Sequence, residues 1–162
     1  MLATIQFMKL DSIDIRILEI LQEDASLQMA DIAQRVGLST TPCWRRVQRL
    51  KEAGVITRQV ALLDAHKVNV GVTVFVSVRT RMHTQEWFET FKATVQAIPE
   101  VVEFYRMSGD VDYLLRVVVP DIAAYDRVYK RLIAGTQLAD VSSSFAMEEL
   151  KLTTALPLGY VN

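Results

Sequence analysis

The spacing of apolar residues changes partway along this 162-residue chain, and that change limits the folds it can adopt. Up to residue 53, apolar residues recur three or four positions apart, which is the period of an amphipathic helix. From residue 72, in "VTVFVSVRT", valines alternate with other residues, as in a strand with one buried face. We therefore predict a helical domain over residues 1–60, a linker strand and loop over residues 61–71, and a second domain over residues 72–162.

Two short helices open the first domain. Asp11 can cap a helix in which Asp14 occupies the third position, a reciprocal pairing known as a capping box. Apolar residues at helical spacing over residues 29–36 indicate a second helix, and Gly37 is the residue type favoured just past a helix end. We expect no side-chain cap at the start of that second helix.

A third helix follows in "TTPCWRRVQRLKEAG". Thr40 or Thr41 can serve as its N-cap, and Pro42 suits the first helical position because the missing N–H would have no partner there. We expect the helix to run from Pro42 to Ala53 and to stop at Gly54. Three helices with a tight turn before the last one predict a (winged) helix-turn-helix at the N-terminus.

Positive charge is concentrated in this part of the chain, although the whole carries 18 Lys plus Arg and 19 Asp plus Glu. Residues 35–58 contain six basic residues and one acidic residue, Glu52, which is a local excess of five positive charges. A basic segment of this kind favours binding to a polyanion. The basic residues are Arg35, Arg45, Arg46, Arg49, Lys51 and Arg58.

The third helix has an apolar stripe formed by Cys43, Val47 and Leu50, which leaves Trp44 and Arg45 outward. The N-terminal end of such a helix enters the major groove of DNA, and flanking arginines can reach phosphates. The alternative is that the arginines form an ordinary solvated face and that Trp44 packs within the protein. The candidate DNA-binding residues are Ser39, Thr40, Thr41, Pro42, Trp44, Arg45, Arg46 and Arg49.

The second domain reads as β-α-β-β-α-β, the order of a ferredoxin-like α+β fold with both helices on one face of an antiparallel sheet. Asp121 can cap its second helix. The expected strands and helices cover residues 72–80, 85–98, 101–108, 112–119, a stretch following Asp121 and 139–150.

The sheet face without helices needs cover. Phe75 or Val76, Phe104 or Tyr105, and Leu114 or Leu115 fall on it, depending on the register of each strand. Apolar side chains on an open sheet face predict dimerisation of one sheet against another.

Several classes of site are disfavoured by composition. Cys43 is the single cysteine, and His66 and His83 are the two histidines, so we expect neither a disulfide nor a metal site nor any cofactor. No apolar run approaches the roughly 20 residues of a membrane span. The start "MLATIQFMKLDSID" lacks a basic region and a small-residue cleavage site, which predicts a cytoplasmic protein without a membrane partner.

Two stretches, "LSTTPCWRRVQRLKEAGVI" and "MSGDVDYLLRV", together resemble the leucine-responsive and asparagine-responsive (Lrp/AsnC) regulators of bacteria and archaea. The tail "SSFAMEELKLTTALPL" is also similar, so the resemblance covers nearly the whole chain. "TTPCWRR", "VALLD", "EWF" and "YKRL" resemble the branch that contains cysteine-responsive and branched-chain amino acid responsive activators.

The resemblance implies a homodimer that assembles further into tetramers or an octamer and binds double-stranded DNA. It also implies a small amino-acid effector, with cysteine, leucine or another branched-chain amino acid as candidates. Taken alone, the Gly109–Asp110 pair is equally well explained as a plain hairpin turn. The residues that match the family's effector site are Ser108, Gly109, Asp110 and Asp112, with Thr136 and Gln137 as weaker candidates.

We expect a transcriptional regulator whose assembly and DNA binding respond to an amino acid. Two alternatives remain: an amino-acid-sensing oligomerisation module, and an architectural protein that organises DNA without a ligand. An enzyme is not expected, because neither histidine has a nucleophile nearby in sequence and Cys43 is predicted to be buried.

Overall fold

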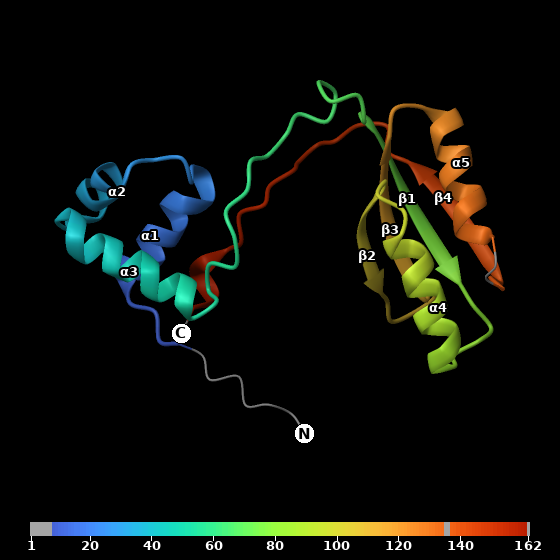
Figure 1. Cartoon of the computed structure of the whole chain (residues 1–162), viewed down its shortest axis with the longest axis horizontal. Helices are drawn as coiled ribbons and strands as arrows, with labels where there is room; N and C mark the ends of the chain where they lie inside the picture. The colour runs from blue at the N-terminus through green and yellow to red at the C-terminus, as the bar shows by residue number, and fades with distance from the viewer. Residues whose placement is uncertain (1–7, 135–136, 162) are drawn as a thin grey trace. The chain divides into compact units, whose positions relative to one another are not determined.

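The computed structural model describes residues 8–134 and 137–161, which form two compact units (Figure 1). One unit contains the chain up to Ala61 together with the residues from Lys151 onward, and the other spans Leu62–Leu150. The sequence assigned the whole of residues 72–162 to the second domain. The structure instead groups the final segment with the helical unit, because that segment packs on the helices there.

The helical unit contains α1 (Ser12–Glu23), α2 (Met29–Val36) and α3 (Thr40–Glu52). The predicted capping box at Asp11 and Asp14 is confirmed, with both reciprocal hydrogen bonds present. α2 has no side-chain cap at its start, as expected. Apolar side chains from all three helices form the core of this unit: Ile17, Leu18, Ile32, Ala33, Val36, Cys43, Val47 and Leu50.

The start of α3 was predicted wrongly. The helix begins at Thr40, with Ser39 as its N-cap, so Pro42 is the third helical residue rather than the first. A proline is still tolerated there, because the N–H groups of the first turn have no carbonyl partner within the helix. Before α3, Gly37 has a left-handed backbone with φ +75°, and the N–H of Leu38 donates to Ala33 O at 2.9 Å, which closes α2 tightly.

The final segment is attached to α1 by a reciprocal pair of hydrogen bonds. Gln22 Nε2 donates to Leu156 O at 3.2 Å, and the N–H of Leu156 donates to Gln22 Oε1 at 2.6 Å. Leu158, in the short 3-10 helix Leu158–Tyr160, is partly buried against the core of the helical unit. An extended segment without a core of its own therefore gains a fixed position on the helices.

The second unit has the predicted βαββαβ order, and its four strands form one antiparallel sheet in the spatial order β2-β3-β1-β4 (Figure 1). Asp121 caps α5 by accepting a hydrogen bond from Ala124 N–H at 2.6 Å. The last strand is shorter than the predicted 139–150. The elements are β1 (Val72–Arg79), α4 (Gln85–Gln96), β2 (Val101–Arg106), β3 (Tyr113–Val119), α5 (Ile122–Ile133) and β4 (Asp140–Phe145).

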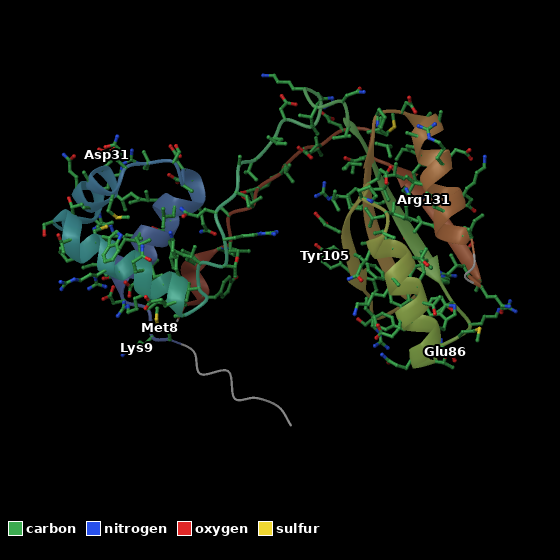
Figure 2. All side chains as sticks on the ribbon, in the orientation of Figure 1. Met8, Lys9, Asp31, Glu86, Tyr105 and Arg131 are labelled. Carbon is green, nitrogen blue, oxygen red and sulfur yellow. The ribbon has the colours of Figure 1, made fainter. Side chains whose placement is uncertain are left out.

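Both helices cover one face of the sheet, where Val74, Val76 and Val78 of β1 are buried. Arg131 of α5, labelled in Figure 2, donates to the carbonyl of Ala97 at 2.8 Å and so ties α5 to the end of α4. The strand register decides which of the alternative residues left open by the sequence lie on the opposite face.

On that opposite face lie Phe75, Tyr105 and Leu114. Phe75 and Tyr105 are both exposed within this chain, and Tyr105 is labelled in Figure 2. An ion pair between Arg116 Nη2 and Glu103 Oε1 at 2.6 Å lies on the same face. We call Phe75, Glu103, Tyr105, Leu114 and Arg116 the open face of the sheet.

Candidate functional site

The N-terminal end of α3 is exposed to solvent. Ser39, Thr40, Thr41 and Pro42 are all exposed, and Trp44 in the next turn is 51% exposed. Opposite them on the helix, the predicted stripe of Cys43, Val47 and Leu50 is fully inside. Trp44 is not among the side chains that form the core of the helical unit or pack against that core. Packing within this unit therefore does not account for Trp44.

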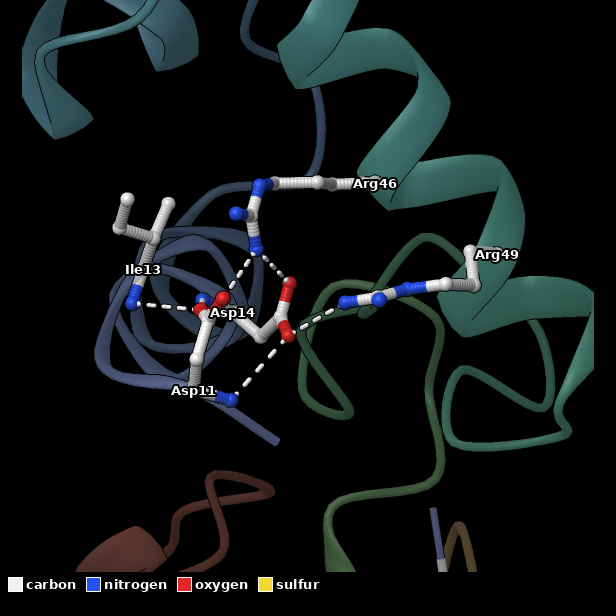
Figure 3. A network of polar contacts seen from close by, with 5 residues as sticks. All are labelled: Asp11, Ile13, Asp14, Arg46 and Arg49. Carbon is white, nitrogen blue, oxygen red and sulfur yellow. Dashed lines mark hydrogen bonds and ion pairs between the residues drawn. The ribbon is translucent and has the colours of Figure 1, made fainter. Parts of the chain in front are cut away.

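The three arginines of α3 have different surroundings. Arg45 is exposed and forms no ion pair with any residue in the described part of the chain. Arg46 Nη1 lies 2.7 Å from Asp11 Oδ2 and 2.8 Å from Asp14 Oδ1. Arg49 Nη2 lies 2.6 Å from Asp14 Oδ2. Figure 3 shows both guanidinium groups directed at the carboxylate of Asp14.

The network has electrostatic consequences for its members. The pKa of Asp11 is lowered, first by the hydrogen bond from the N–H of Asp14 and then by that from Arg46. The pKa of Arg46 is raised, first by Asp11 and then by Asp14. Both groups are therefore held in their charged forms.

Asp14 was not among the predicted site residues. Its side chain is fully buried, and it also accepts a hydrogen bond from the N–H of Asp11 at 3.2 Å. The sequence carried a signal for it, because Asp14 precedes Ile17 by three residues and Leu18 by four and so shares their buried face. A carboxylate on an apolar stripe requires a cationic or hydrogen-bonding partner.

In the second unit, the β2–β3 turn carries the predicted effector residues. Ser108, Gly109 and Asp110 are exposed, and Gly109 has φ +118°, a backbone conformation that favours glycine. A Cβ built at Gly109 would meet nothing within 4 Å. Within this chain, glycine is thus explained by the backbone angle, and the space beside it is open.

Asp112 is more deeply involved in the fold than its neighbours. Its carboxylate Oδ2 accepts a hydrogen bond from Thr80 N–H at 2.8 Å, and its own N–H donates to Val78 O at 3.0 Å. Asp112 therefore joins the start of β3 to the end of β1. One carboxylate oxygen of Asp112 is therefore already hydrogen-bonded within the chain before a ligand binds at this turn.

The β2–β3 turn and the segment that leads into β4 lie beside the same end of β1, on opposite sides of it. The β2–β3 turn is bonded to the end of β1 through Asp112, and Ala139 N–H donates to Arg79 O at 2.9 Å on the other side of β1. Gln137 is exposed and lines an open hollow of about 660 Å³ beside the start of β4. Thr136 lies outside the described residues.

Within residues 8–134 and 137–161, no group of three or more His, Cys, Asp or Glu side chains is arranged to hold a metal ion. Among those same residues, no helix combines the length and the apolar character that crossing a bilayer demands.

A helix-turn-helix with an exposed, basic third helix, joined to a ferredoxin-like domain, defines a class of two-domain DNA-binding regulators. Residues 10–57 match the family model described as a winged helix-turn-helix DNA-binding domain, and residues 73–156 match that of the Lrp/AsnC ligand-binding domain. The chain belongs to the Lrp/AsnC family of transcriptional regulators, a family of regulators and not of enzymes.

Relatives agree over nearly the full length. The glutamate uptake regulatory protein of Zymomonas mobilis is 50% identical over 93% of this chain and 92% of its own. The crystal structure of an AsnC family transcriptional regulator from Agrobacterium tumefaciens is 65% identical, covers 94% of this chain and 100% of its own, and superimposes with a TM-score of 0.91. A transcriptional regulator from Neisseria meningitidis in complex with L-Met is 37% identical over 94% and 99%, with a TM-score of 0.89.

Proposed function

We propose that the N-terminal end of α3 reads the major groove of an operator. Ser39, Thr40, Thr41, Pro42 and Trp44 supply the contacts to bases and the adjacent backbone. The exposed Trp44 at this end of the helix is the observation that carries the proposal. Arg45, exposed and unpaired among the described residues, contacts a phosphate.

The effector in this proposal is a small amino acid bound at the β2–β3 turn. The open space at Gly109 lets a zwitterion approach the backbone, and the carboxylate of Asp110 can accept a hydrogen bond from its α-ammonium group. Ser108, Asp112, Gln137 and the adjacent Thr136 complete the proposed set. The complex of the Neisseria relative with L-Met supports an amino acid as the class of ligand.

Assembly links the two sites. The open face of the sheet pairs two chains into a homodimer, and dimers associate into tetramers or an octamer on DNA in the cytoplasm. An effector that binds one assembly more tightly than another shifts the balance between them, and each assembly presents its α3 helices at a different spacing.

Site-directed variants test the DNA contacts. Replacing Thr41 or Trp44 with alanine should change the preference among operator sequences, whereas Arg45→Ala should weaken binding to all sequences alike. Footprinting should show two half-sites on one face of the duplex, and fluorescence anisotropy over a salt series supplies the affinities. A single isolated half-site, or Thr41 and Trp44 variants that keep the wild-type preference, would contradict this assignment.

The effector is tested by a thermal-shift screen of the twenty amino acids combined with the mass measured by light scattering. A stabilising amino acid that also changes the oligomer mass supports the proposal, and Asp110→Asn should weaken that response. Cysteine, leucine and the other branched-chain amino acids are the first candidates. If no amino acid shifts either quantity, the chain organises DNA without an amino-acid signal.

A further inference from the structure

The positive charge of α3 is not equally available to a ligand. Arg46 and Arg49 each direct a guanidinium group at the fully buried carboxylate of Asp14, while Arg45 is exposed and has no ion-pair partner among the described residues. Asp14 and Asp11 together carry two negative charges opposite the two positive charges of Arg46 and Arg49 (Figure 3). The excess of basic residues counted along the sequence therefore overstates the positive charge that is free to contact DNA phosphates.

Competition with a phosphate is unfavourable for both arginines. Arg46 bonds to Oδ1 of the buried Asp14 carboxylate and Arg49 to Oδ2, so the loss of either arginine removes part of the compensation of a charge in a medium of low polarity. That cost is larger than the gain from an exposed ion pair. Arg49 remains 50% exposed and so lies near solvent, yet its Nη2 is only 2.6 Å from Asp14 Oδ2. Exposure alone thus does not make it available to DNA.

We propose that Asp14 keeps Arg46 and Arg49 from contacting DNA phosphates and thereby limits sequence-independent binding, in addition to holding α3 against α1. This inference rests on the proposed DNA-binding function. Because each phosphate contact releases counterions, the slope of log K against log salt counts the basic residues that reach the backbone. A residue that only supports the fold would leave this slope unchanged.

A matched pair of variants tests the two kinds of arginine. Arg45→Ala should reduce the magnitude of the salt slope by about one for each helix-turn-helix bound. Arg49→Ala should leave the slope at the wild-type value, and this variant keeps Arg46 as the partner of Asp14. Anisotropy titrations of the full chain with operator and non-operator duplexes over a salt series give both slopes.

Asp14→Asn provides the opposite change. Releasing the two arginines should steepen the slope for non-operator DNA by about one to two and lower the ratio of operator to non-operator affinity. Asp31→Asn is the control, since it removes one negative charge from an exposed position on α2 of the same unit (Asp31 is labelled in Figure 2). Circular dichroism at the titration temperature verifies that each variant is folded.

The outcomes separate the two hypotheses. An Asp14→Asn slope equal to that of Asp31→Asn, or an Arg49→Ala slope reduced as much as that of Arg45→Ala, overturns the role of Asp14 while DNA binding by the wild-type chain stands. A wild-type chain without salt-dependent DNA binding overturns the proposed function, and the role of Asp14 with it. If Asp14→Asn does not fold, the Arg45 and Arg49 pair decides.

Discussion

Cys43 lies on the buried side of α3 and has no exposed surface. Burial raises the pKa of its thiol, and the nearby Arg46 opposes that rise only in part. A raised pKa leaves less thiolate at any pH below it, and the thiolate is the reactive form. We expect a thiol-specific chromogenic disulfide at pH 8 to label the native chain slowly and the denatured chain completely. Equal rates in the two states would show that the thiol is accessible.

A second prediction at the level of one residue concerns Gly109. Its φ of +118° strains any residue with a Cβ, so Gly109→Ala should lower the free energy of unfolding by about 1–3 kcal/mol. Gly159→Ala is the matched control, because a Cβ there also meets nothing within 4 Å and no left-handed φ is required. Urea denaturation compares the two variants. Equal costs would mean that backbone conformation does not explain the glycine.

At the scale of elements, the attachment of the final segment depends on one apolar side chain and one amide. Leu158 is partly buried against the core of the helical unit, whereas the side chain of Leu156 is 71% exposed. Leu158→Ala should therefore lower the stability of the helical unit by about 1–2 kcal/mol, less than truncation of a fully buried leucine. Leu156→Ala should stay within about 0.5 kcal/mol of the wild type.

Thermal unfolding, followed by the circular dichroism of the helices, compares the stability of the two leucine variants. If the two are equally stable, the segment from Lys151 onward contributes little packing energy. The hydrogen bonds between the side-chain amide of Gln22 and the main chain of Leu156 are available in both variants, so a difference between them reports on packing by the leucine side chain alone.

The same elements show what a sequence can predict. Local signals decided most boundaries: Asp11 and Asp121 cap helices, and Gly37 ends one. The start of α3 was missed because Ser39, Thr40 and Thr41 are all residue types that suit an N-cap. The return of the final segment to the helices was not predictable, since an extended stretch carries no periodicity that says where it packs.

In the candidate site too, local features could be predicted from the sequence and contacts between distant segments could not. The exposed position of Trp44 follows from helical spacing within α3 alone. The pairing of Arg46 and Arg49 with Asp14 requires α1 to pack against α3, a contact between residues more than thirty positions apart. The position of the β2–β3 turn and of the start of β4 beside the same end of β1 likewise depends on strand order and not on local sequence.

For the whole molecule, assembly is the property that a single substitution on the open face should change. Phe75→Asp replaces an exposed apolar side chain of that face with a charge that a covering partner chain would desolvate, and it should convert the proposed dimer into monomers. Ile122→Asp, at a position 70% exposed on α5 on the helix side of the sheet, should leave the dimer intact. Sedimentation velocity gives both masses. A dimeric Phe75→Asp chain would exclude the open face as the interface.

The helical unit is assembled from two separate parts of the chain, with residues 62–150 between them. A ribosome therefore makes all three helices first, then the entire sheet domain, and only afterwards the residues that complete the packing around Gln22 and Leu158. Domains fold largely as units during synthesis, in order from the N-terminus. The fully packed DNA-binding unit thus cannot form during translation until the domain proposed to regulate it has already been made.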